Sequence, residues 1–284
     1  MPTAAVNGQT LYYEVHGEGE PLLCVMGLSA DTLAWMLQLP AFSAAHRTVV
    51  FDNRDVGQSS MATGAYEIAD MAQDALALAD VLELESFHLL GVSMGGAIAQ
   101  EVVLAAPERV RTLTLAVTFP AGGAWARKLS EVWSERVTKI SREGHVDELM
   151  LLNFSEAFYE NEQGVEWVRG MMLQHPHPQP PEAFIRQLEA CGRHDARERL
   201  RSVDVPTHVI GGEYDILVPA WKSRELAELV PQPDCILQPT NLTGVCCKSR
   251  ESVRCGLPGR FNVPHLDAVS ARLKRPQVRG QPTN

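Results

Sequence analysis

Residues 89–96 read Leu89-Leu90-Gly91-Val92-Ser93-Met94-Gly95-Gly96, and they are the most informative residues of the chain. The apolar run at 87–90 is typical of a buried strand, and residues 97–106 are typical of a helix packed on a sheet. Between them, Gly-x-Ser-x-Gly places a serine on a strained turn from strand to helix, where flanking glycines avoid Cβ clashes. We therefore expect the Ser93 hydroxyl to project above the sheet, near the positive end of the following helix.

Strand and helix patterns alternate around this turn. Strand patterns lie at residues 11–15, 21–26, 47–52, 110–117, 206–212 and 234–237, and helix patterns at 33–44, 68–82 and 220–229. Strands that alternate with helices in this way predict an α/β fold with a mostly parallel, doubly wound sheet and helices on both faces.

The pattern changes between residues 121 and 199. Helical segments follow one another there without strands, at 124–142, 146–158, 162–173 and 181–192, and a rigid proline-rich linker separates the last two. We predict a core of residues 1–120 and 200–238, with residues 121–199 inserted as a helical cap. Residues 239–284 form a separate, atypical C-terminal segment.

Four stretches between residues 9 and 238 resemble the α/β-hydrolase family. They are the serine turn at 91–95; residues 26–31, where the family carries an oxyanion loop; residues 52–59, similar to its D-x-R-x-x-G-x-S loop; and residues 211–219, similar to the G-x-x-D-x-x-V-P segment that carries its catalytic acid. Within the family, the chain looks most like small carboxylesterases and serine hydrolases of the 3-oxoadipate enol-lactonase type. Those proteins often have Met-Gly, as here at residues 26–27, where other members have His-Gly.

The resemblance implies a role for each candidate residue. Ser93 is the expected nucleophile and Asp215 the expected acid, because a serine hydroxyl needs a base to accept its proton and an acid to orient that base. The backbone N–H groups of Leu28 and Met94 are the expected oxyanion hole. A methionine in place of histidine before Gly27 does not affect a backbone N–H donor. Arg54 and Asp55 are expected to be structural, tying loops together.

The catalytic base is harder to place. The family order is serine, acid, histidine, with the histidine normally about 25–30 residues after the acid. Of the nine histidines, only His265 follows Asp215, and it lies 50 residues further on, while residues 238–247 contain none. His265 is the candidate base.

The segment that carries His265 differs from the rest of the chain. Residues 239–284 contain six arginines and two lysines against Glu251 and Asp267, and three of the six cysteines. No apolar helix periodicity follows the last strand pattern, although the family ends on a helix packed against the sheet. Two hypotheses stay open. Either His265 is the base after an unusual insertion, or the reading frame is shifted near residue 239 and the histidine-bearing tail is missing. If His265 is the base, the chain between Leu237 and Pro264 must be an ordered excursion that returns to the carboxyl edge of the sheet. The composition of the segment argues against that, so we expect residues 239–284 to be poorly packed and His265 to lie away from Ser93.

The composition limits the classes of partner that the protein is expected to bind. A formal net charge of −10 argues against nucleic acid and anionic membrane surfaces as partners. The N-terminal residues lack the basic and apolar regions of a secretory signal, so the expected location is the cytoplasm. No cofactor is expected, and no metal site, since His175 and His177 lack a carboxylate or cysteine partner at ligand spacing. The expected partner is a small-molecule ester, and the oligomeric state is not predicted.

The expected activity is hydrolysis of carboxylic esters through an acyl-enzyme on Ser93. Gly27, Trp125 and Trp133 are the candidate substrate-pocket residues. An apolar, uncharged and bulky ester is favoured because the cap is rich in aromatic and methionine residues, namely Trp125, Trp133, Phe154, Phe158, Tyr159, Trp167, Met171 and Met172. The alternatives are an enol-lactonase, a C–C hydrolase or a perhydrolase, and a catalytically impaired protein if no histidine completes the triad.

Overall fold

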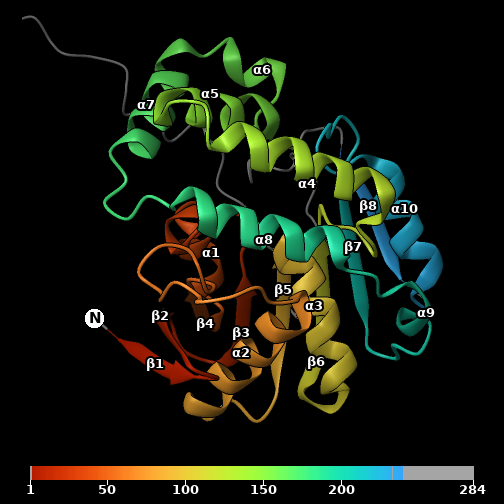
Figure 1. The fold of residues 1–284 in the computed structure, drawn as a ribbon. Coiled ribbons are helices and arrows are strands. Elements are labelled where there is room, and N and C mark those ends of the chain that lie inside the picture. The colour runs from red at the N-terminus through yellow and green to blue at the C-terminus, as the bar shows by residue number, and fades with distance from the viewer. Residues whose placement is uncertain (1, 232, 239–284) are drawn as a thin grey trace, which may run out of the picture.

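An eight-stranded sheet forms the centre of the computed structural model, which describes residues 2–231 and 233–238 (Figure 1). The strands are β1 (Thr3–Val6), β2 (Gln9–His16), β3 (Glu20–Val25), β4 (His46–Phe51), β5 (Phe87–Val92), β6 (Val110–Ala116), β7 (Thr207–Gly212) and β8 (Asp234–Gln238), in the order β1-β2-β4-β3-β5-β6-β7-β8. β1 and β2 pair antiparallel, as do β2 and β4, and every pairing from β4 to β8 is parallel. The predicted mostly parallel sheet is confirmed.

Helices follow most of the strands, as the sequence predicts. They are the 3-10 helix η1 (Thr32–Trp35), α1 (Leu39–Ser43), α2 (Ile68–Val81), α3 (Met94–Ala105), the 3-10 helix η2 (Pro107–Arg109), α4 (Gly123–Val137), α5 (Arg142–Asn153), α6 (Glu156–Tyr159), α7 (Glu162–Leu173), α8 (Pro181–Arg193), α9 (Arg197–Leu200) and α10 (Ala220–Leu229). Helices α4–α8, the cap helices, lie between β6 and β7 in the chain. In Figure 1, α8 crosses the sheet domain, with α4 to α7 beyond it.

Apolar packing covers both faces of the sheet. Along β3, Leu23 and Val25 join one core cluster with residues of α2 and α3, whereas Leu22 and Cys24 join a second cluster that contains Trp35. Successive strand residues point to opposite faces, so a strand that is apolar throughout is buried on both sides. This explains the continuous apolar runs seen in the sequence.

The structure differs from the sequence-based expectation in a few elements. The single helix expected at 33–44 is two short ones, η1 and α1, because Pro40 lacks an N–H and fits only the first turn of a helix. The helix expected at 124–142 ends at Val137, and Ser141 begins α5 by accepting a hydrogen bond from the Gly144 N–H at 3.1 Å. The sequence analysis did not predict strand β1. Among the described residues, no helix has the length and apolar character needed to cross a bilayer.

Candidate active site

Ser93 occupies a strained turn between β5 and α3. Its backbone has φ 56° and ψ −120°, a region that costs a non-glycine residue roughly 1–3 kcal/mol and persists only where the surroundings hold it. The Ser93 N–H donates to the Ala116 carbonyl at 2.9 Å, and the Thr118 hydroxyl donates to the Ser93 carbonyl at 2.6 Å. Both contacts come from the end of β6 and the residues after it, so the neighbouring strand fixes the turn.

The flanking glycines allow the close approach of strand and helix. A Cβ on Gly91 would lie 2.3 Å from the Gly95 carbonyl oxygen, and a Cβ on Gly95 would lie 2.1 Å from the Val25 carbonyl oxygen. Real Cβ atoms do not approach backbone this closely. The two glycines of the motif are therefore needed to bring the first turn of α3 against the end of β3.

The loop after β3 lies against the serine. A Cβ on Gly27 would be 3.0 Å from the Cβ of Ser93 and 3.5 Å from its Oγ. The Ala30 N–H donates to the Gly27 carbonyl at 3.4 Å and closes a turn, and the Asn53 side chain donates to the Met26 carbonyl at 3.0 Å. This turn, residues 26–30, is called the oxyanion loop because of its predicted role.

The two predicted oxyanion donors lie on either side of this contact. Met94 is the first residue of α3 and is buried, and Leu28 follows Gly27 and is partly buried. The first N–H groups of a helix have no partner within the helix, so the Met94 N–H can donate to a ligand. The assignment of both N–H groups to an oxyanion hole stays a prediction.

Asp215 follows β7 and is buried, with 4% of its surface exposed. Its Oδ1 accepts hydrogen bonds from the N–H groups of Leu217 at 2.9 Å and Val218 at 2.7 Å, which fix the orientation of the carboxyl group. β5, β6 and β7 are adjacent and parallel, so the residues that follow β5 and β7 emerge at the same edge of the sheet. The structure thus places Ser93 and Asp215 at one edge of the sheet, as the roles predicted for them require.

The candidate base His265 and the atypical segment 239–284 lie outside the described residues. Within residues 2–231 and 233–238, no histidine forms a hydrogen bond with the Ser93 hydroxyl. His175, from the linker before α8, has its Nε2 2.8 Å from Oδ2 of Asp31, so it contacts the chain directly after the oxyanion loop.

The two candidate pocket tryptophans lie in different environments. Trp125, near the start of α4, is 61% exposed. Trp133 is partly buried, with its ring centroid 6.1 Å from that of Phe184, and it packs with Leu28 against the buried residues Val137, Phe184 and Leu188. This apolar cluster joins α4 and α8 to the oxyanion loop.

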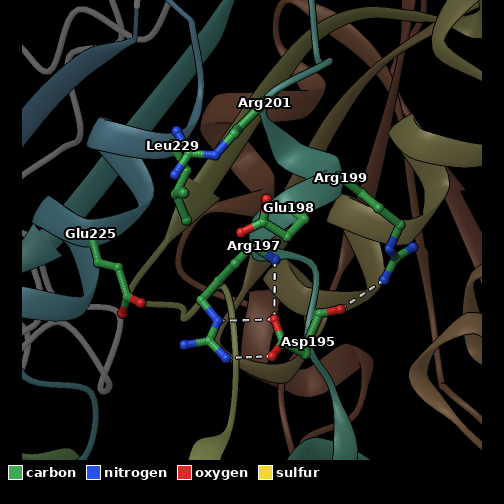
Figure 2. Close-up of a pocket in the computed structure, with 7 residues that line it drawn as sticks. All are labelled: Asp195, Arg197, Glu198, Arg199, Arg201, Glu225 and Leu229. Carbon is green, nitrogen blue, oxygen red and sulfur yellow. Dashed lines mark hydrogen bonds and ion pairs between the residues drawn. The ribbon is translucent and has the colours of Figure 1, made fainter.

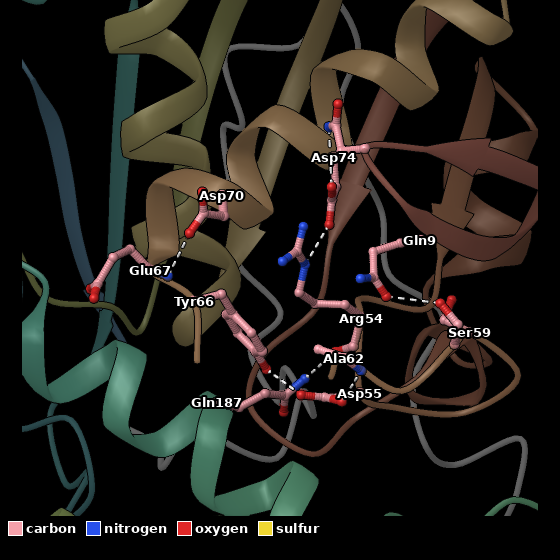
Figure 3. A network of polar contacts seen from close by, with 12 residues as sticks. Gln9, Arg54, Asp55, Ser59, Ala62, Tyr66, Glu67, Asp70, Asp74 and Gln187 are labelled. Carbon is pink, nitrogen blue, oxygen red and sulfur yellow. Dashed lines mark hydrogen bonds and ion pairs between the residues drawn. The ribbon is translucent and has the colours of Figure 1, made fainter. Parts of the chain in front are cut away.

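The second family loop, residues 52–59, forms a polar network that Figure 3 shows from close by. The buried Asp55 carboxylate accepts hydrogen bonds from the Ala62 N–H at 2.7 Å and the Tyr66 hydroxyl at 2.8 Å, and Arg186 of α8 binds both its oxygens at 2.8 and 2.6 Å. Burial raises the pKa of Tyr66 far above its usual range, so its hydroxyl remains a donor. Asp55 therefore ties the core to a cap helix.

Arg54 and Gly57 of this loop also have specific structural roles. Arg54 Nε donates to Asp74 Oδ2 at 2.7 Å, with both side chains buried. Gly57 has φ 59°, and a Cβ there would lie 2.2 Å from Oδ2 of Asp52. The expected structural role of Arg54 and Asp55 agrees with these contacts.

A surface depression of about 400 Å³ lies elsewhere (Figure 2). It is lined by Asp195, Arg197, Glu198, Arg199, Arg201, Glu225 and Leu229. Two of its charged groups are engaged with each other, since Arg197 binds both oxygens of Asp195. None of the residues around Ser93 lines it, so the polar depression is not the candidate active site.

A glutamine that the sequence analysis did not identify contacts the oxyanion loop. Gln187 of α8 has no exposed surface, and its Oε1 accepts a hydrogen bond from the Ser29 N–H at 3.0 Å. Ser29 and Gln187 lie 158 residues apart in the chain, and a helix glutamine belongs to none of the motifs. No sequence signal pointed to it.

The fold and the serine turn define a hydrolase of the α/β class, and a comparison of sequences agrees. The family model described as alpha/beta hydrolase fold matches residues 20–240. The chain belongs to the alpha/beta hydrolase fold family.

Among curated relatives, the protein named "Putative carbamate hydrolase RutD" from Azorhizobium caulinodans is 32% identical over 233 residues, which cover 81% of this chain and 87% of the relative. The protein named 3-oxoadipate enol-lactonase 1 from Acinetobacter baylyi is 27% identical over 214 residues, which cover 73% of this chain and 77% of the relative.

Solved structures show the same fold. A hydrolase from Pseudomonas aeruginosa PA01 has a TM-score of 0.75 and 28% identity, over 84% of this chain and 90% of that one. A thermophilic esterase from Thermogutta terrifontis, solved with malate bound, has a TM-score of 0.73 and 27% identity, over 84% of this chain and 88% of that one.

Proposed function

We propose that the protein is a serine hydrolase that cleaves carboxylic esters through an acyl-enzyme on Ser93. The observation that carries this proposal is the conformation of Ser93, with φ 56° at the start of α3 and with Gly27 close to its side chain. Backbone strain of this kind is found where a fold presents a side chain for reaction. An α/β-hydrolase uses this turn to raise its nucleophile above the sheet.

The proposed steps use the roles that the family resemblance assigns to these groups. The Ser93 Oγ attacks the acyl carbon as the base takes its proton, and the N–H groups of Leu28 and Met94 stabilise the oxyanion. The base then protonates the departing alcohol, and water attacks the acyl-enzyme with the same base as acceptor. Asp215 orients the base, for which His265 is the candidate. Each oxyanion donor stabilises the transition state by roughly 3 kcal/mol.

Apolar, uncharged esters are the favoured substrates. The cap cluster around Phe184 packs directly on Leu28, so apolar cap side chains lie beside a predicted oxyanion donor. Several cationic side chains of the cap are ion-paired with carboxylates, namely Lys128, Arg136, Lys139, Arg169 and Arg186. These pairs disfavour recognition of a dicarboxylate lactone, which would need cations directed at the substrate.

Carbamate hydrolysis is the second candidate, because a relative that is 32% identical is named as a carbamate hydrolase. An aryl carbamate and an aryl ester present similar carbonyl groups to the serine. The three activities are distinguished by measuring kcat/KM on three substrates: p-nitrophenyl butyrate, a p-nitrophenyl N-alkylcarbamate, and an enol-lactone with a free carboxylate. The proposal expects the ester to have the highest kcat/KM. A higher value for the carbamate or the lactone reassigns the substrate but keeps Ser93.

The test of the mechanism is labelling by a fluorophosphonate probe, with the modified peptide identified by mass spectrometry. Wild type is expected to label at Ser93, and Ser93→Ala is expected neither to label nor to hydrolyse p-nitrophenyl esters. The matched control is Ser86→Ala, because Ser86 directly precedes β5, the strand that Ser93 follows, and so lies at the opposite edge of the sheet. Labelling of another serine, or more than a tenth of the activity in Ser93→Ala, contradicts the proposal.

A second variant decides the base. If His265→Ala loses hydrolysis by about 10³-fold or more, His265 completes the triad. If wild type itself labels slowly and hydrolyses nothing, the chain is a catalytically impaired member of its family.

A further inference from the structure

The oxyanion loop is held in a conformation that its own sequence does not favour. Ser29 has φ 63°, in the left-handed region that L-residues other than glycine rarely adopt. A residue in such a region keeps its conformation only where its surroundings determine it. The contact that Ser29 makes outside its own loop therefore bears on the geometry of the Leu28 N–H, one residue earlier.

That contact is with a cap helix. The Ser29 N–H donates to Gln187 Oε1 at 3.0 Å, and the Gln187 Nε2 donates to the Arg54 carbonyl at 2.9 Å. Gln179 Nε2 donates to the same Gln187 oxygen at 3.0 Å and to the Asp55 carbonyl at 2.9 Å. Gln187 is completely buried, and its donor and acceptor atoms are both used in linking the loops that follow β3 and β4.

The same helix supports the loop through apolar contacts as well. Leu28 packs on the cluster that contains Phe184 and Leu188 of α8. The side chain of Leu28 and the backbone of Ser29 therefore both rest on one helix, which supports the peptide unit between them.

We propose that Gln187 is a positioning residue of the active site: it holds the Ser29 N–H so that the preceding N–H of Leu28 points at the oxyanion. The cap would then contribute to catalysis itself, besides forming the substrate pocket. This inference rests on the proposed function, because it gives the Leu28 N–H its predicted role. If Gln187 only attached the cap to the core, its loss would affect substrate binding. If it orients an oxyanion donor, its loss would affect stabilisation of the transition state.

The test compares Gln187→Met with Arg193→Met. Methionine preserves the length and volume of glutamine but cannot accept the Ser29 hydrogen bond. Arg193 attaches the same helix to the core by donating to Glu67 Oε1 at 2.7 Å and to the Tyr66 carbonyl at 2.8 Å, with no contact to the oxyanion loop. Both variants are measured for kcat and KM on p-nitrophenyl butyrate and for amide hydrogen exchange of the peptide covering residues 27–31.

Gln187→Met is expected to lower kcat about 10-fold with KM changed less than about twofold, because misplacing an oxyanion donor affects the transition state more than substrate binding. Exchange at residues 27–31 is expected to become faster. Arg193→Met is expected to leave kcat and this exchange unchanged. An unchanged kcat in Gln187→Met, an effect confined to KM, or an equal loss of kcat in Arg193→Met overturns the inference.

Gln187→Glu keeps the inference testable if the methionine variant does not fold. Burial favours the protonated form of a glutamate at this position; its carbonyl oxygen can accept the Ser29 N–H and its hydroxyl can donate to the Arg54 carbonyl, as Gln187 Nε2 does. Gln187→Glu is therefore expected to keep kcat within about threefold of wild type and to keep slow exchange at residues 27–31. Loss of both overturns the inference. Failure of the proposed function is seen separately, as wild type that does not label at Ser93, and the exchange data then still decide whether Gln187 holds the loop.

Discussion

Gly27 leaves room for Ser93: a Cβ on Gly27 would lie 3.0 Å from the Cβ of Ser93 and 3.1 Å from the carbonyl oxygen of Val92. A methyl group at this position would force the neighbours apart by a few tenths of an ångström. The glycine that precedes a predicted oxyanion donor is thus also the residue that leaves room for the predicted nucleophile. The two sides of the candidate site constrain each other through this close approach.

Gly27→Ala is expected to lower kcat by at least about 10-fold while costing roughly 1 kcal/mol of stability, because the added methyl displaces the serine or the loop. The measurements are p-nitrophenyl butyrate hydrolysis and urea unfolding. Gly64→Ala is the control, since a Cβ on Gly64 has nothing within 4 Å. Full activity in Gly27→Ala would show that the loop and Ser93 can separate without consequence.

Asp215→Asn is expected to keep the fold and to lower kcat by about 10³–10⁴-fold, because an amide no longer stabilises the protonated base. The hydrogen bonds that the Leu217 and Val218 N–H groups donate to Oδ1 can be kept by the asparagine oxygen, so the unfolding curve is expected to change little. Asp204→Asn, in the loop before β7, serves as the control. Retained activity in Asp215→Asn would remove Asp215 from the triad.

Arg186→Met is expected to destabilise the protein by roughly 2–3 kcal/mol, because it leaves the fully buried Asp55 carboxylate without its cationic partner. The expected loss of stability is smaller than that for breaking a fully buried ion pair, because Arg186 is partly exposed. Arg169→Met removes a surface pair with Asp147 and is expected to change stability little. Equal urea midpoints for the two variants would contradict a special role for Asp55 in joining cap and core.

His194 is expected to make the stability depend on pH. Burial lowers its pKa to about 4, with Glu101 nearby opposing the shift. Between about pH 6.5 and 4 the unfolded chain binds a proton at this histidine and the folded protein does not, so stability falls as the pH decreases through this window, by roughly 3 kcal/mol in total. Urea unfolding at several pH values should show a smaller decrease for His194→Gln than for wild type. Parallel curves for the two proteins would contradict this assignment.

The sequence predicted the parts of the fold that depend on short stretches. The strand, the glycines and the helix around Ser93 are adjacent in the chain, and their pattern indicates the turn because the steric requirement there involves only neighbouring residues and one approaching strand. The same holds for Asp215, whose carboxyl group is oriented by N–H groups two and three residues away. By contrast, Pro40 divided the helix expected at 33–44, a local signal that the apolar pattern obscured.

By itself, therefore, the sequence determined the fold class, the serine turn and the place of Asp215 after a strand of the sheet, since each follows from local periodicity or a contiguous motif. Only the tertiary structure decided which cap residues reach the core. Arg186 and Gln187 are adjacent on α8, yet one binds a buried carboxylate and the other a backbone N–H on a different loop. Such pairings depend on how a helix inserted between β6 and β7 lies across the ends of β3 and β4. That arrangement is set by packing between residues more than a hundred positions apart, for which the chain carries no local pattern.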